Sequence, residues 1–436
     1  MGFKYQKFPD ISCDGCRIIW DSRQIESENE KIFIDIDLDI KIKEKLRKRS
    51  NNIVEHDDSK RELAEACQLK NLSQKLKIVG ITGTNGKTTC VHMLSEYFSL
   101  LGKKVLSIGT QGLLYFNEGS CQQKIETGFT SLPAPNLADV LKQAIDLKVQ
   151  YVFMEVSSHA IALFREWGLN YELKALTNIT VDHLDFHDNF DNYKNCKLSW
   201  LNDLTNVRGK SLTSKQYNEV ELQDQFSVTN NRVFYNNHAL KFFGKFNAYN
   251  CQLCFEIIKN LGFDNEIEIW KKLSSVPGRY ELVCSKENIS YFVDFAHTPD
   301  SLEKTLTLNT DNSIYKIVVL GCGGNRDKTK RADMASIACQ HSDFLVLTSD
   351  NPRDEEAMAI VNGMIKGLRA KRGYTVELDR RLAIKRSIMR AQKKFKEHKE
   401  VHVYILGKGD EAYQEIKGQK LPFKDKEVLL SLIKEH

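Results

Sequence analysis

The sequence predicts an α/β protein of three domains, the two larger of them built on mainly parallel sheets. The chain has 436 residues, and at roughly 100–200 residues per domain this length corresponds to about two to four domains. Short apolar strands alternate with helix-length segments in two long stretches, which is typical of parallel sheets covered by helices. Polar clusters follow several of these strands, at the carboxyl ends where open α/β sheets bind ligands.

Composition and charge are those of a soluble globular protein. Hydrophobic residues make up 41% and charged residues 28% of the chain, enough for both a core and a solvated surface. The net charge of +5, from 63 basic and 58 acidic residues, is too weak to indicate nucleic-acid binding. The Lys/Arg-rich runs 41–50 and 390–399 are interleaved with apolar residues and are interpreted as solvated helix faces. We therefore expect no nucleic-acid partner.

Cysteine usage and the N-terminus indicate the compartment. The eleven cysteines are scattered, as expected for free thiols in a reducing cytoplasm. Residues 1–15 lack the apolar core of a signal peptide, and no apolar run approaches the ~18 residues of a membrane span. We expect a cytoplasmic protein without membrane insertion, and a monomer.

Residues 1–75 form the first region, expected to be a small α/β domain. The region is short and charged, with an alternating strand candidate at residues 32–42. It ends in a polar, helical-looking connector.

Residues 76–274 form the second region, a predicted parallel sheet that carries a phosphate-binding loop. A helix follows the loop at residues 88–104, another is expected at 247–262, and residues 212–246 look β-like and could extend the sheet. The expected strands are residues 75–82, 105–110, 151–158 and 175–180.

Residues 275–436 form the third region, a smaller, doubly wound, Rossmann-like domain. It repeats the alternation of strand and helix. The expected strands are residues 291–297, 314–324, 343–353 and 401–409.

The stretch "GITGTNGKTT", residues 80–89, predicts a nucleotide-binding loop. Lys87 and Thr88 fit the end of the P-loop pattern, but its first glycine would fall at Ile81. Small residues still let backbone N–H groups surround phosphates at a helix N-terminus. Lys87 can reach the β- and γ-phosphates, and the Thr88 hydroxyl can ligate Mg²⁺. The alternative is a Gly-rich turn without a ligand.

Two later stretches add candidate metal ligands. Glu155 ends a predicted strand in "MEVSSHAIALFREWG", and the alternative there is a helix cap by Ser157 or Ser158. Several Asp, two His and Lys197 follow within residues 177–200, a composition that suits Mg²⁺ or Mn²⁺. The alternative is a polar loop with Lys197 in a surface salt bridge.

Polar clusters also follow four strands of the third region, at residues 294–302, 321–331, 348–356 and 407–414. Two are Gly-rich, and two carry Arg, whose planar fork suits a carboxylate or a phosphate. A turn without function explains each cluster alone, but four successive strand ends favour a binding site.

From residue 76 to the C-terminus the motifs resemble the Mur ligase family. They occur in order as "GTNGKTT", "EVSSHA", "TNITVDHLDFH", "NYKNCK", "FNAYN", "PGR", "DFAHTPDSLE", "GCGGNRDKTKR", "SDNPR" and "GKGDE". More narrowly, they resemble the members that add the third residue of the peptidoglycan stem. The resemblance implies a UDP-sugar domain at residues 1–75, an ATP domain at 76–274 and an amino-acid domain at 275–436.

The implied reaction is ATP-dependent amide synthesis in peptidoglycan precursor formation. A carboxylate of UDP-N-acetylmuramoyl-L-alanyl-D-glutamate would attack the γ-phosphate, and the amine of meso-diaminopimelate would then displace phosphate from the acyl phosphate. ATP, the UDP-muramoyl dipeptide and meso-diaminopimelate are the implied partners, with two Mg²⁺ ions. Lys197 falls where the family carries a lysine carbamylated by CO₂, which would make it a metal ligand.

The resemblance also assigns residues. Metal ligands and catalytic groups would be Lys87, Thr88, Glu155, His183 and Lys197 as its carbamate. ATP would contact Gly83, Thr84, Asn85, Gly86, Lys87, Thr88, Thr89, Asn247, Asn250 and Arg279. Asp294 and His297 match a hinge-side motif. The UDP-muramoyl peptide would contact Ser22, Thr130, Ser131, Ser157 and Arg165. Diaminopimelate would contact Arg326, Asp350, Asn351, Arg353, Gly407 and Glu411.

Arg353 gives the implied specificity for diaminopimelate over lysine. The distal carboxylate, which lysine lacks, would be held by Arg353 with Arg326, and Glu411 suits the substrate ammonium. An Arg left buried and unpaired would reject lysine strongly.

The sequence departs from the family pattern at three places. Asp410 stands where the family usually has His, Ala332 stands where Pro is usual, and the N-terminal region is short. The alternatives are a ligase that adds lysine or another amino acid, a folylpolyglutamate-synthase-like ligase, and an ATP-driven switch of another class.

Overall fold

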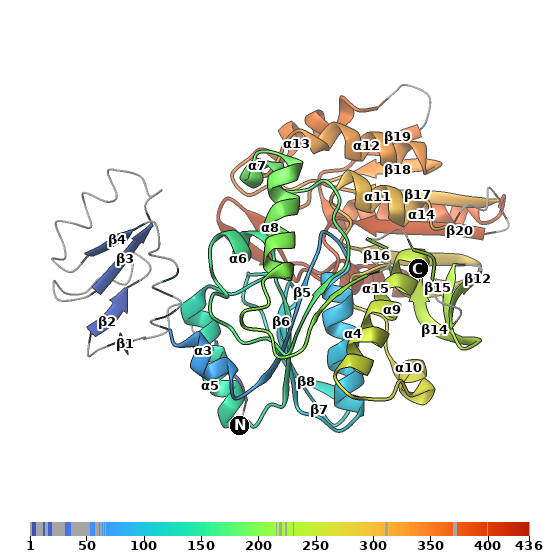
Figure 1. Cartoon of the computed structure of the whole chain (residues 1–436). Coiled ribbons are helices and arrows are strands. Elements are labelled where there is room, and N and C mark those ends of the chain that lie inside the picture. Colours follow the sequence, from blue (N-terminus) through green and yellow to red (C-terminus); the bar gives the residue numbers. More distant parts are fainter. Residues whose placement is uncertain are drawn as a thin grey trace. The chain divides into compact units, whose positions relative to one another are not determined.

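In the computed structural model the chain folds into two compact units (Figure 1). One contains residues 1–227, 234–240 and 246–273, and the other contains residues 228–233, 241–245 and 274–436. The structure describes residues 2–5, the backbone of four short strands between residues 12 and 56, residues 61, 63 and 65, and residues 67–435 without 215, 218–219, 223–224, 230, 310–312, 369–372 and 399.

A four-stranded sheet lies near the N-terminus. Its order is β1 (Ser12–Cys13), β2 (Cys16–Ile19), β3 (Lys31–Asp35) and β4 (Ile53–His56). β1 and β2 are antiparallel, and the other pairs are parallel. β3 covers the start of the strand predicted at residues 32–42; its remainder, the basic run 41–50 and Ser22 lie outside the described residues.

The central sheet has seven strands in the order β11-β10-β5-β9-β6-β7-β8, and the first five are mutually parallel. β5 is buried except at its first residue, as expected for a parallel strand covered on both faces. The strands are β5 (Lys77–Thr82), β6 (Val105–Gly109), β7 (Gly112–Asn117), β8 (Ser120–Ile125), β9 (Tyr151–Glu155), β10 (Leu173–Leu176) and β11 (Ser211–Thr213).

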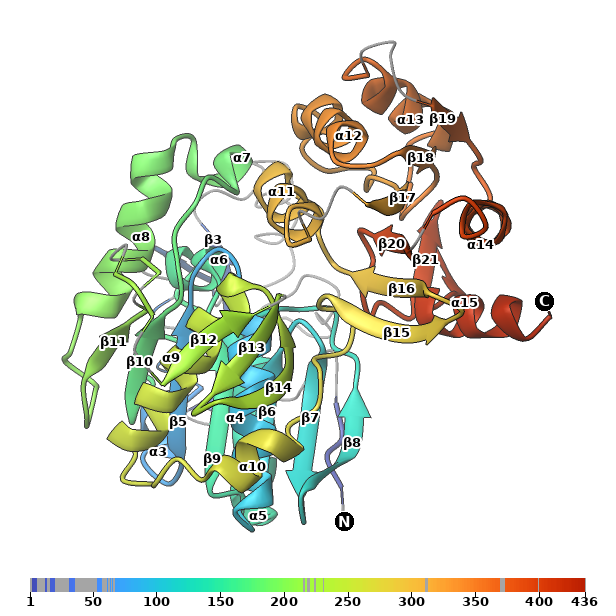
Figure 2. The same cartoon turned by 90° about the vertical axis from the view of Figure 1, so that its right-hand side faces the viewer.

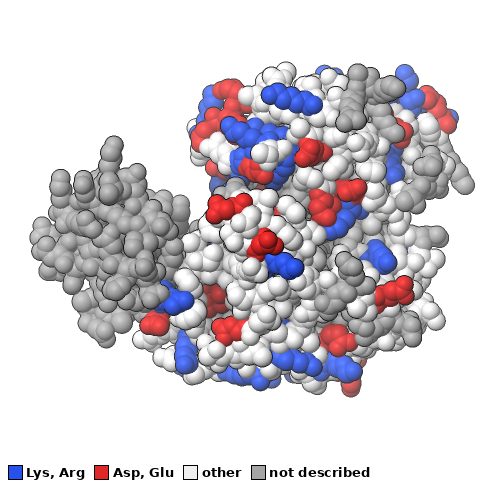
Figure 3. Space-filling model, turned by 45° about the horizontal axis from the view of Figure 1, so that its top comes forward, with Lys and Arg blue, Asp and Glu red and all other residues white. Residues whose placement is uncertain are grey.

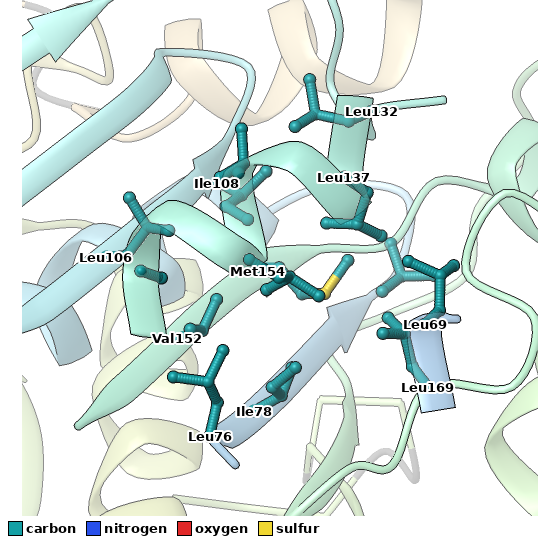
Figure 4. Close-up of a cluster of buried hydrophobic side chains, with 14 of the residues drawn as sticks. Leu69, Leu76, Ile78, Leu106, Ile108, Leu132, Leu137, Val152, Met154 and Leu169 are labelled. Carbon is teal, nitrogen blue, oxygen red and sulfur yellow. The ribbon is translucent and has the colours of Figure 1, made fainter. Parts of the chain in front are cut away.

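Alternate residues of these strands pack on two helical layers. On one face Ile78, Leu106 and Met154 join Leu137 of α5 (Ala134–Asp146) in a hydrophobic cluster (Figure 4). On the other face the Phe98 ring of α4 (Lys87–Leu100) lies 5.1 Å from that of Phe153. The remaining helices are α3 (Leu69–Ser73), α6 (Ser158–Ala162), α7 (Leu184–His187), α8 (Phe190–Asn202), α9 (Lys245–Asn260) and α10 (Ile267–Lys272).

The β-like stretch after residue 211 forms two structures. β11 extends the central sheet, because it pairs in parallel with β10. β12 (Phe226–Thr229), β13 (Arg232–Tyr235) and β14 (His238–Phe243) form a separate three-stranded sheet.

The C-terminal unit is a doubly wound domain with a six-stranded sheet in the order β15-β16-β20-β17-β18-β19 (Figure 2). Only the edge strand β15 is antiparallel to its neighbour. The strands are β15 (Glu281–Lys286), β16 (Ile289–Asp294), β17 (Ile314–Leu320), β18 (Phe344–Leu347), β19 (Gly373–Val376) and β20 (Glu400–Leu406). A hairpin of β21 (Tyr413–Ile416) and β22 (Gln419–Pro422) follows β20.

Helices cover both faces of this sheet. α11 (Pro299–Leu306), α12 (Lys330–Gln340) and α13 (Ala357–Ile365) enclose one hydrophobic cluster. α14 (Arg380–Lys394) and α15 (Asp425–Lys434) enclose the other. The predicted fold class, an α/β protein with a small N-terminal sheet and two larger helix-covered sheets, is confirmed.

Two properties of the surface and interior complete the fold. Acidic and basic side chains are interspersed on the face shown in Figure 3. The cysteines whose side chains the structure describes, all between residues 67 and 339, are free thiols. Among the described helices, none is both long and apolar enough to cross a membrane.

Candidate active site

The Gly-rich loop joins β5 to α4. Gly83 (φ 141°) and Gly86 (φ 87°) both have positive φ, a conformation that favours glycine. A Cβ on Gly83 would lie 1.9 Å from Thr177 Oγ1, and one on Gly86 would lie 2.5 Å from Asn250 Oδ1. The loop leads directly into α4 at Lys87, where a helix N-terminus stabilises anions. The loop therefore depends on glycine at both positions.

Gly80 has a different role from the two loop glycines. It lies within β5, and a Cβ there would approach Tyr171 Cε1 to 2.7 Å and Trp200 Cζ2 to 3.0 Å. Glycine at this position makes room for two aromatic side chains, one of them on α8. The glycine spacing of this stretch therefore reflects packing against β5 as well as the shape of the loop.

Hydrogen bonds hold the loop in one conformation. Lys87 Nζ donates to the backbone oxygens of Gly83 and Thr84, at 2.8 Å each. Thr84 Oγ1 donates to Thr180 O at 3.1 Å and lies 2.9 Å from the Tyr193 hydroxyl. The loop is thereby tied to the segment after β10 and to α8.

Glu155, at the end of β9, lies beside the start of α4. Its side chain is buried, with 1% of the residue exposed. Oε1 accepts hydrogen bonds from Thr88 Oγ1 at 2.9 Å and from the backbone N–H of Thr110 at 2.8 Å, and Oε2 accepts from Thr110 Oγ1 at 3.2 Å. A Cβ on Gly109 would meet Oε1 at 2.2 Å. The structure thus brings together two predicted metal ligands, Thr88 and Glu155.

Four residues predicted to hold the muramoyl peptide gather at the same strand end. Ser131 Oγ donates to Glu155 O at 2.9 Å and to Ser157 Oγ at 3.3 Å. Arg165 Nη1 donates to Ser131 O at 3.1 Å, and burial lowers the pKa of the Arg165 guanidinium. Thr130 Oγ1 lies 3.2 Å from Thr110 Oγ1.

Ser157 also caps a helix, as the alternative interpretation of this stretch expects. Its Oγ accepts the N–H of Ala160 at 3.1 Å, at the start of α6. This short helix carries the chain away from Glu155.

Lys197 lies inside the protein next to the loop. Only 1% of the residue is exposed, and Nζ donates to Gly83 O at 3.1 Å and to Thr82 Oγ1 at 3.4 Å. Nζ also lies 4.9 Å from the centre of the Tyr193 ring. Burial and the nearby charge of Lys87 hold the pKa of Lys197 well below its usual value. The alternative of a surface salt bridge is therefore wrong.

His183 lies at the entrance to α7, with a φ of 53°. Its side chain is 43% exposed, its Nε2 lies 3.5 Å from Asp182 Oδ2, and its ring centre lies 4.8 Å from that of His159. Among the described residues no three His, Cys, Asp or Glu side chains form a metal-binding group. The predicted metal set contains only two residues of these types, Glu155 and His183.

One residue of the predicted adenine and ribose region, Asn250, lies against the loop, and a second, Asn247, contacts Asn250. Asn250 Nδ2 donates to Asn247 Oδ1 at 3.1 Å on α9, and Asn250 Oδ1 is the atom that crowds Gly86. Arg279 belongs to the C-terminal unit, where its guanidinium lies 4.1 Å from the centre of the Phe295 ring.

The hinge-side motif holds the start of β15 in place. Asp294 is buried, accepts the N–H of Tyr280 at 2.6 Å and that of Ala296 at 2.9 Å, and has a pKa raised by burial. His297 is exposed, with its Nδ1 2.8 Å from Phe295 O.

Four predicted diaminopimelate residues meet around Lys408, which is completely buried. Lys408 Nζ donates to Asn351 Oδ1 at 3.1 Å, to Glu411 Oε2 at 3.0 Å and to a backbone oxygen of β21 at 2.7 Å. Asn351 Nδ2 also donates to Glu411 Oε2 at 2.8 Å. Gly407 has φ 110°, and a Cβ there would lie 2.7 Å from Asp350 Oδ2.

The two predicted arginines flank Gly323. A Cβ on Gly323 would lie 3.1 Å from Arg353 Nη1 and 3.6 Å from Arg326 Cγ. Arg353 Nη1 donates to Gly324 O at 2.8 Å, and Nε lies 3.2 Å from Glu415 Oε2. Arg353 therefore has a counter-ion within the chain, Glu415. That an arginine left unpaired would reject lysine stays a prediction.

Arg380 holds the chain just after β18 and at the end of β20, through hydrogen bonds to backbone carbonyls. It is fully buried in a bidentate ion pair with Asp425, with both N···O distances 2.7 Å. Its Nη1 donates to Ser349 O at 3.3 Å and its Nη2 to Leu406 O at 3.0 Å. These two carbonyls directly precede Asp350 and Gly407, so the ion pair fixes both segments of the pocket.

Asp410, the departure from the family's usual His, is also ion-paired. Its Oδ1 lies 3.0 Å from Lys424 Nζ. A Cβ on Gly278 would lie 2.2 Å from Asp410 N, so the segment around Gly278 packs directly on this loop.

Sequence reasoning missed several residues that organise the two sites: Thr110, Tyr193, Arg380, Lys408 and Glu415. Three of them carried a signal. Thr110 ends the predicted strand 105–110, Tyr193 lies inside the "NYKNCK" motif, and Lys408 lies inside the "GKGDE" motif. Glu415 and Arg380 carried no such signal, since their partners are distant in sequence or lie on another element.

Comparisons with known proteins agree with this geometry. The family model for the Mur ligase middle domain matches residues 81–207, and that for the Mur ligase glutamate ligase domain matches residues 278–409. A UDP-N-acetylmuramoyl-L-alanyl-D-glutamate--2,6-diaminopimelate ligase of Clostridium botulinum is 35% identical over 418 residues, covering 88% of this chain and 83% of the relative. The protein of the same name from Cytophaga hutchinsonii is 38% identical over 396 residues, covering 83% and 78%.

A solved structure supports the fold independently. It is a UDP-N-acetylmuramoyl-L-alanyl-D-glutamate--2,6-diaminopimelate ligase with a TM-score of 0.59 and 24% identity, covering 96% of this chain and 94% of that one. The two family matches and the extent of the curated relatives lead to one conclusion: the chain belongs to the Mur ligase family.

Proposed function

We propose that this chain is an ATP-dependent amide-bond ligase that adds meso-diaminopimelate to UDP-N-acetylmuramoyl-L-alanyl-D-glutamate, in peptidoglycan precursor synthesis. Relatives 33–38% identical carry the name of this ligase. The observation that carries the proposal is the position of Lys197, which is buried beside the phosphate loop. A buried lysine whose pKa is lowered is expected at a functional site, whereas a lysine in a surface salt bridge would keep its ordinary pKa. A cytoplasmic location remains a prediction.

Each region is proposed to bind one substrate. Residues 1–75 would bind the UDP-sugar, residues 76–274 ATP, and residues 275–436 the amino acid. Ser22 lies outside the described residues, so its role in muramoyl binding remains a prediction. Thr130, Ser131, Ser157 and Arg165 would position the dipeptide carboxylate near Glu155, to which Ser131 is hydrogen-bonded.

In the first step the substrate carboxylate attacks the γ-phosphorus of ATP. One P–O bond forms, the bond to ADP breaks, and an acyl phosphate results. Backbone N–H groups of residues 83–89 and the Lys87 ammonium would neutralise charge that spreads over the phosphate oxygens. Asn247, Asn250 and Arg279 would hold the adenine and ribose.

The residues around Glu155 fit a divalent cation. Thr88 supplies a hydroxyl and Glu155 a carboxylate, with 2.9 Å between the two oxygens, and hard oxygen ligands of this kind suit Mg²⁺. Mg²⁺ bound there would supply positive charge to the transferred phosphoryl group. His183 would serve a second ion.

Lys197 is proposed to act as its carbamate. The neutral amine attacks CO₂, an N–C bond forms, and one proton is released, which converts a cation into an anion. The lowered pKa of Lys197 favours the neutral form that this reaction requires. The carbamate would then join Glu155 and His183 as a metal ligand.

In the second step the free amine of diaminopimelate attacks the acyl carbon. A C–N bond forms, the C–O bond to phosphate breaks, and the amine loses a proton. Asp350, Asn351, Gly407 and Glu411 would hold the ammonium at the substrate's distal end. Arg353, with Arg326, would hold the distal carboxylate.

An amino-acid panel tests the proposal. Phosphate release is measured with ATP, Mg²⁺, the UDP-dipeptide and either meso-diaminopimelate, lysine, ornithine or glutamate. We expect rapid release with diaminopimelate only, and little release when the UDP-dipeptide is omitted. Release that needs no carboxylate acceptor would instead indicate an ATP-driven switch, and preferred use of lysine or glutamate would indicate one of the alternative ligases.

A further inference from the structure

The first strand of the hairpin β21–β22 forms hydrogen bonds with three residues of the segment that carries Arg353. Gln414 Nε2 donates to Asp350 O at 2.8 Å, and Glu415 N donates to Asn351 Oδ1 at 2.9 Å. Arg353 N donates to Glu415 O at 2.9 Å. Asp350, Asn351 and Arg353 of the proposed amino-acid site are therefore held by one four-residue strand. The second half of this strand, Glu415 and Ile416, lies beyond the polar cluster 407–414 that predicted the site.

The hairpin also holds the backbone of Arg353 in an uncommon conformation. Arg353 has φ 53°, in the left-handed region that residues other than glycine rarely occupy. Lys417 N donates to Arg353 O at 2.8 Å, and Arg353 forms an isolated parallel bridge with Ile416. The direction in which the Arg353 side chain leaves the backbone is therefore set by the hairpin, through β21 and the turn residue Lys417.

Two of the three guanidinium nitrogens of Arg353 have protein partners. Nη1 donates to Gly324 O at 2.8 Å, and Nε lies 3.2 Å from Glu415 Oε2. The two side chains are 22% and 27% exposed, so solvent and ligands reach them. In the part of the chain that the structure describes, no hydrogen bond is made by Nη2. A carboxylate that approached Nη2 would meet a guanidinium whose charge is already shared with Glu415.

We propose that Glu415 is a specificity-determining residue, an internal counter-ion with which the distal carboxylate of the amino acid competes for Arg353. This inference rests on the proposed function, which makes Arg353 the receptor of that carboxylate. Glu415 compensates Arg353 when the amino acid lacks a distal carboxylate, so lysine avoids the penalty of leaving an arginine unpaired. Glu415 therefore reduces the ratio of the two affinities, that for diaminopimelate over that for lysine, relative to a site without this carboxylate.

The substitution Glu415→Gln removes the charge and keeps the size of the side chain. Binding is measured by calorimetry in the presence of Mg–ADP for three compounds: meso-diaminopimelate, 2-aminopimelate, which lacks the distal amine, and L-lysine, which lacks the distal carboxylate. We expect the ratio of the Kd for lysine to the Kd for 2-aminopimelate to rise about two- to fivefold, the range measured for partly exposed ion pairs. Glu415→Asp, with a retracted carboxylate, should give an intermediate ratio.

The control is Glu356→Gln. Glu356 lies near the same hairpin and pairs with Lys417 at 3.3 Å, but both of those side chains are more than 70% exposed. This variant removes an equal charge without contacting Arg353, and its ratio should equal that of the wild type. Circular dichroism and the thermal midpoint verify that each variant is folded.

Several outcomes would overturn the inference. The first is an unchanged Kd ratio in both Glu415 variants, and the second is an equal rise of the ratio in Glu356→Gln. The third is a loss of diaminopimelate binding while 2-aminopimelate binding is unaffected, which would place Glu415 at the distal ammonium. In an Arg353→Gln background the substitution of Glu415 should have no effect on the ratio, and a persisting effect would also contradict the inference. The inference is also overturned if the wild type binds none of the three compounds. If instead the Kd ratios change as expected but the protein does not ligate diaminopimelate in the presence of ATP, only the proposed function is overturned.

Discussion

The proposed phosphoryl-transfer site and the proposed amino-acid site differ in how their buried cationic side chains are paired. Beside the loop, the buried Lys197 donates only to a hydroxyl and a backbone carbonyl, and no carboxylate of the described residues lies within salt-bridge distance of its Nζ. In the C-terminal unit Lys408, Arg353 and Arg380 each have a carboxylate within 3.2 Å. The first site holds a buried lysine without a carboxylate partner among the described residues, whereas in the second site Lys408, Arg353 and Arg380 have carboxylate partners within the chain itself.

The substitution with the largest expected effect is Lys197→Ala. If Lys197 acts as a carbamate, the variant loses a metal-binding anion, and the rate of phosphate release should fall about 10³-fold or more. A short-chain carboxylic acid should restore part of the rate, because it can occupy the space of the missing group. The measurement is product formation with and without added acetate or formate.

Lys174→Ala is the matched control. Lys174 is also buried, but its Nζ donates to Trp200 O at 2.8 Å and Asp203 O at 2.7 Å, at the end of α8. This variant should be less stable and should show no rescue. Rescue of both variants, or of neither, would contradict a specific role for a Lys197 carbamate.

Arg380→Met tests whether the C-terminal site depends on internal neutralisation. The variant leaves Asp425 buried without its partner, so we expect the free energy of unfolding of this unit to fall by about 3–5 kcal/mol. Denaturant unfolding followed by circular dichroism measures the change. The double variant Arg380→Met/Asp425→Leu should recover much of the stability, and a failure to do so would show that the bonds to the carbonyls of Ser349 and Leu406 matter more than the charges.

Arg353→Ala separates amino-acid binding from nucleotide binding. Loss of the carboxylate receptor should reduce kcat/KM for diaminopimelate about 30- to 100-fold, equivalent to about 2–3 kcal/mol, with the KM for ATP nearly unchanged. Arg386→Ala is the control, because Arg386 is an exposed arginine paired with Glu377 at 2.9 Å. Equal losses in diaminopimelate and ATP use would contradict the role of Arg353 as a receptor.

The smallest expected effect concerns pH. Hydrogen bonds from Arg331, followed by that from the backbone of Asn325, lower the pKa of Glu355 to about 2, below the ~4.3 of an unfolded glutamate. A lowered pKa means that the contribution of Glu355 to stability is complete above about pH 5 and is lost as the pH falls toward 2. The stability difference between wild type and Glu355→Gln, about 1 kcal/mol at neutral pH, should therefore shrink across this window in unfolding titrations. A stability difference that did not change with pH would show that the size of the Glu355 side chain, and not its charge, contributes to stability.

The sequence predicted the fold class well for physical reasons that lie along the chain. Strands buried on both faces form apolar runs, and the alternation with helices indicates parallel sheets, so β5, β9, β16, β17, β18 and β20 follow from pattern alone. Predicted site residues such as Thr88 and Glu155 lie at strand ends and helix starts, where topology brings them together. The pairing of Arg353 with Glu415 could not be predicted, because Glu415 lies 62 positions later, beyond the polar cluster 407–414.

By itself, the sequence determined which chemical groups this protein carries and the order in which they follow the strands, since both depend on local pattern. Only the tertiary structure decided their burial and their partners. Burial of Lys197 lowers its pKa, the two aromatic rings beside Gly80 explain that glycine, and Arg353 and Arg380 meet Glu415 and Asp425 across long separations. Desolvation and pairing depend on what surrounds a group in three dimensions, and no spacing along the chain contains that information.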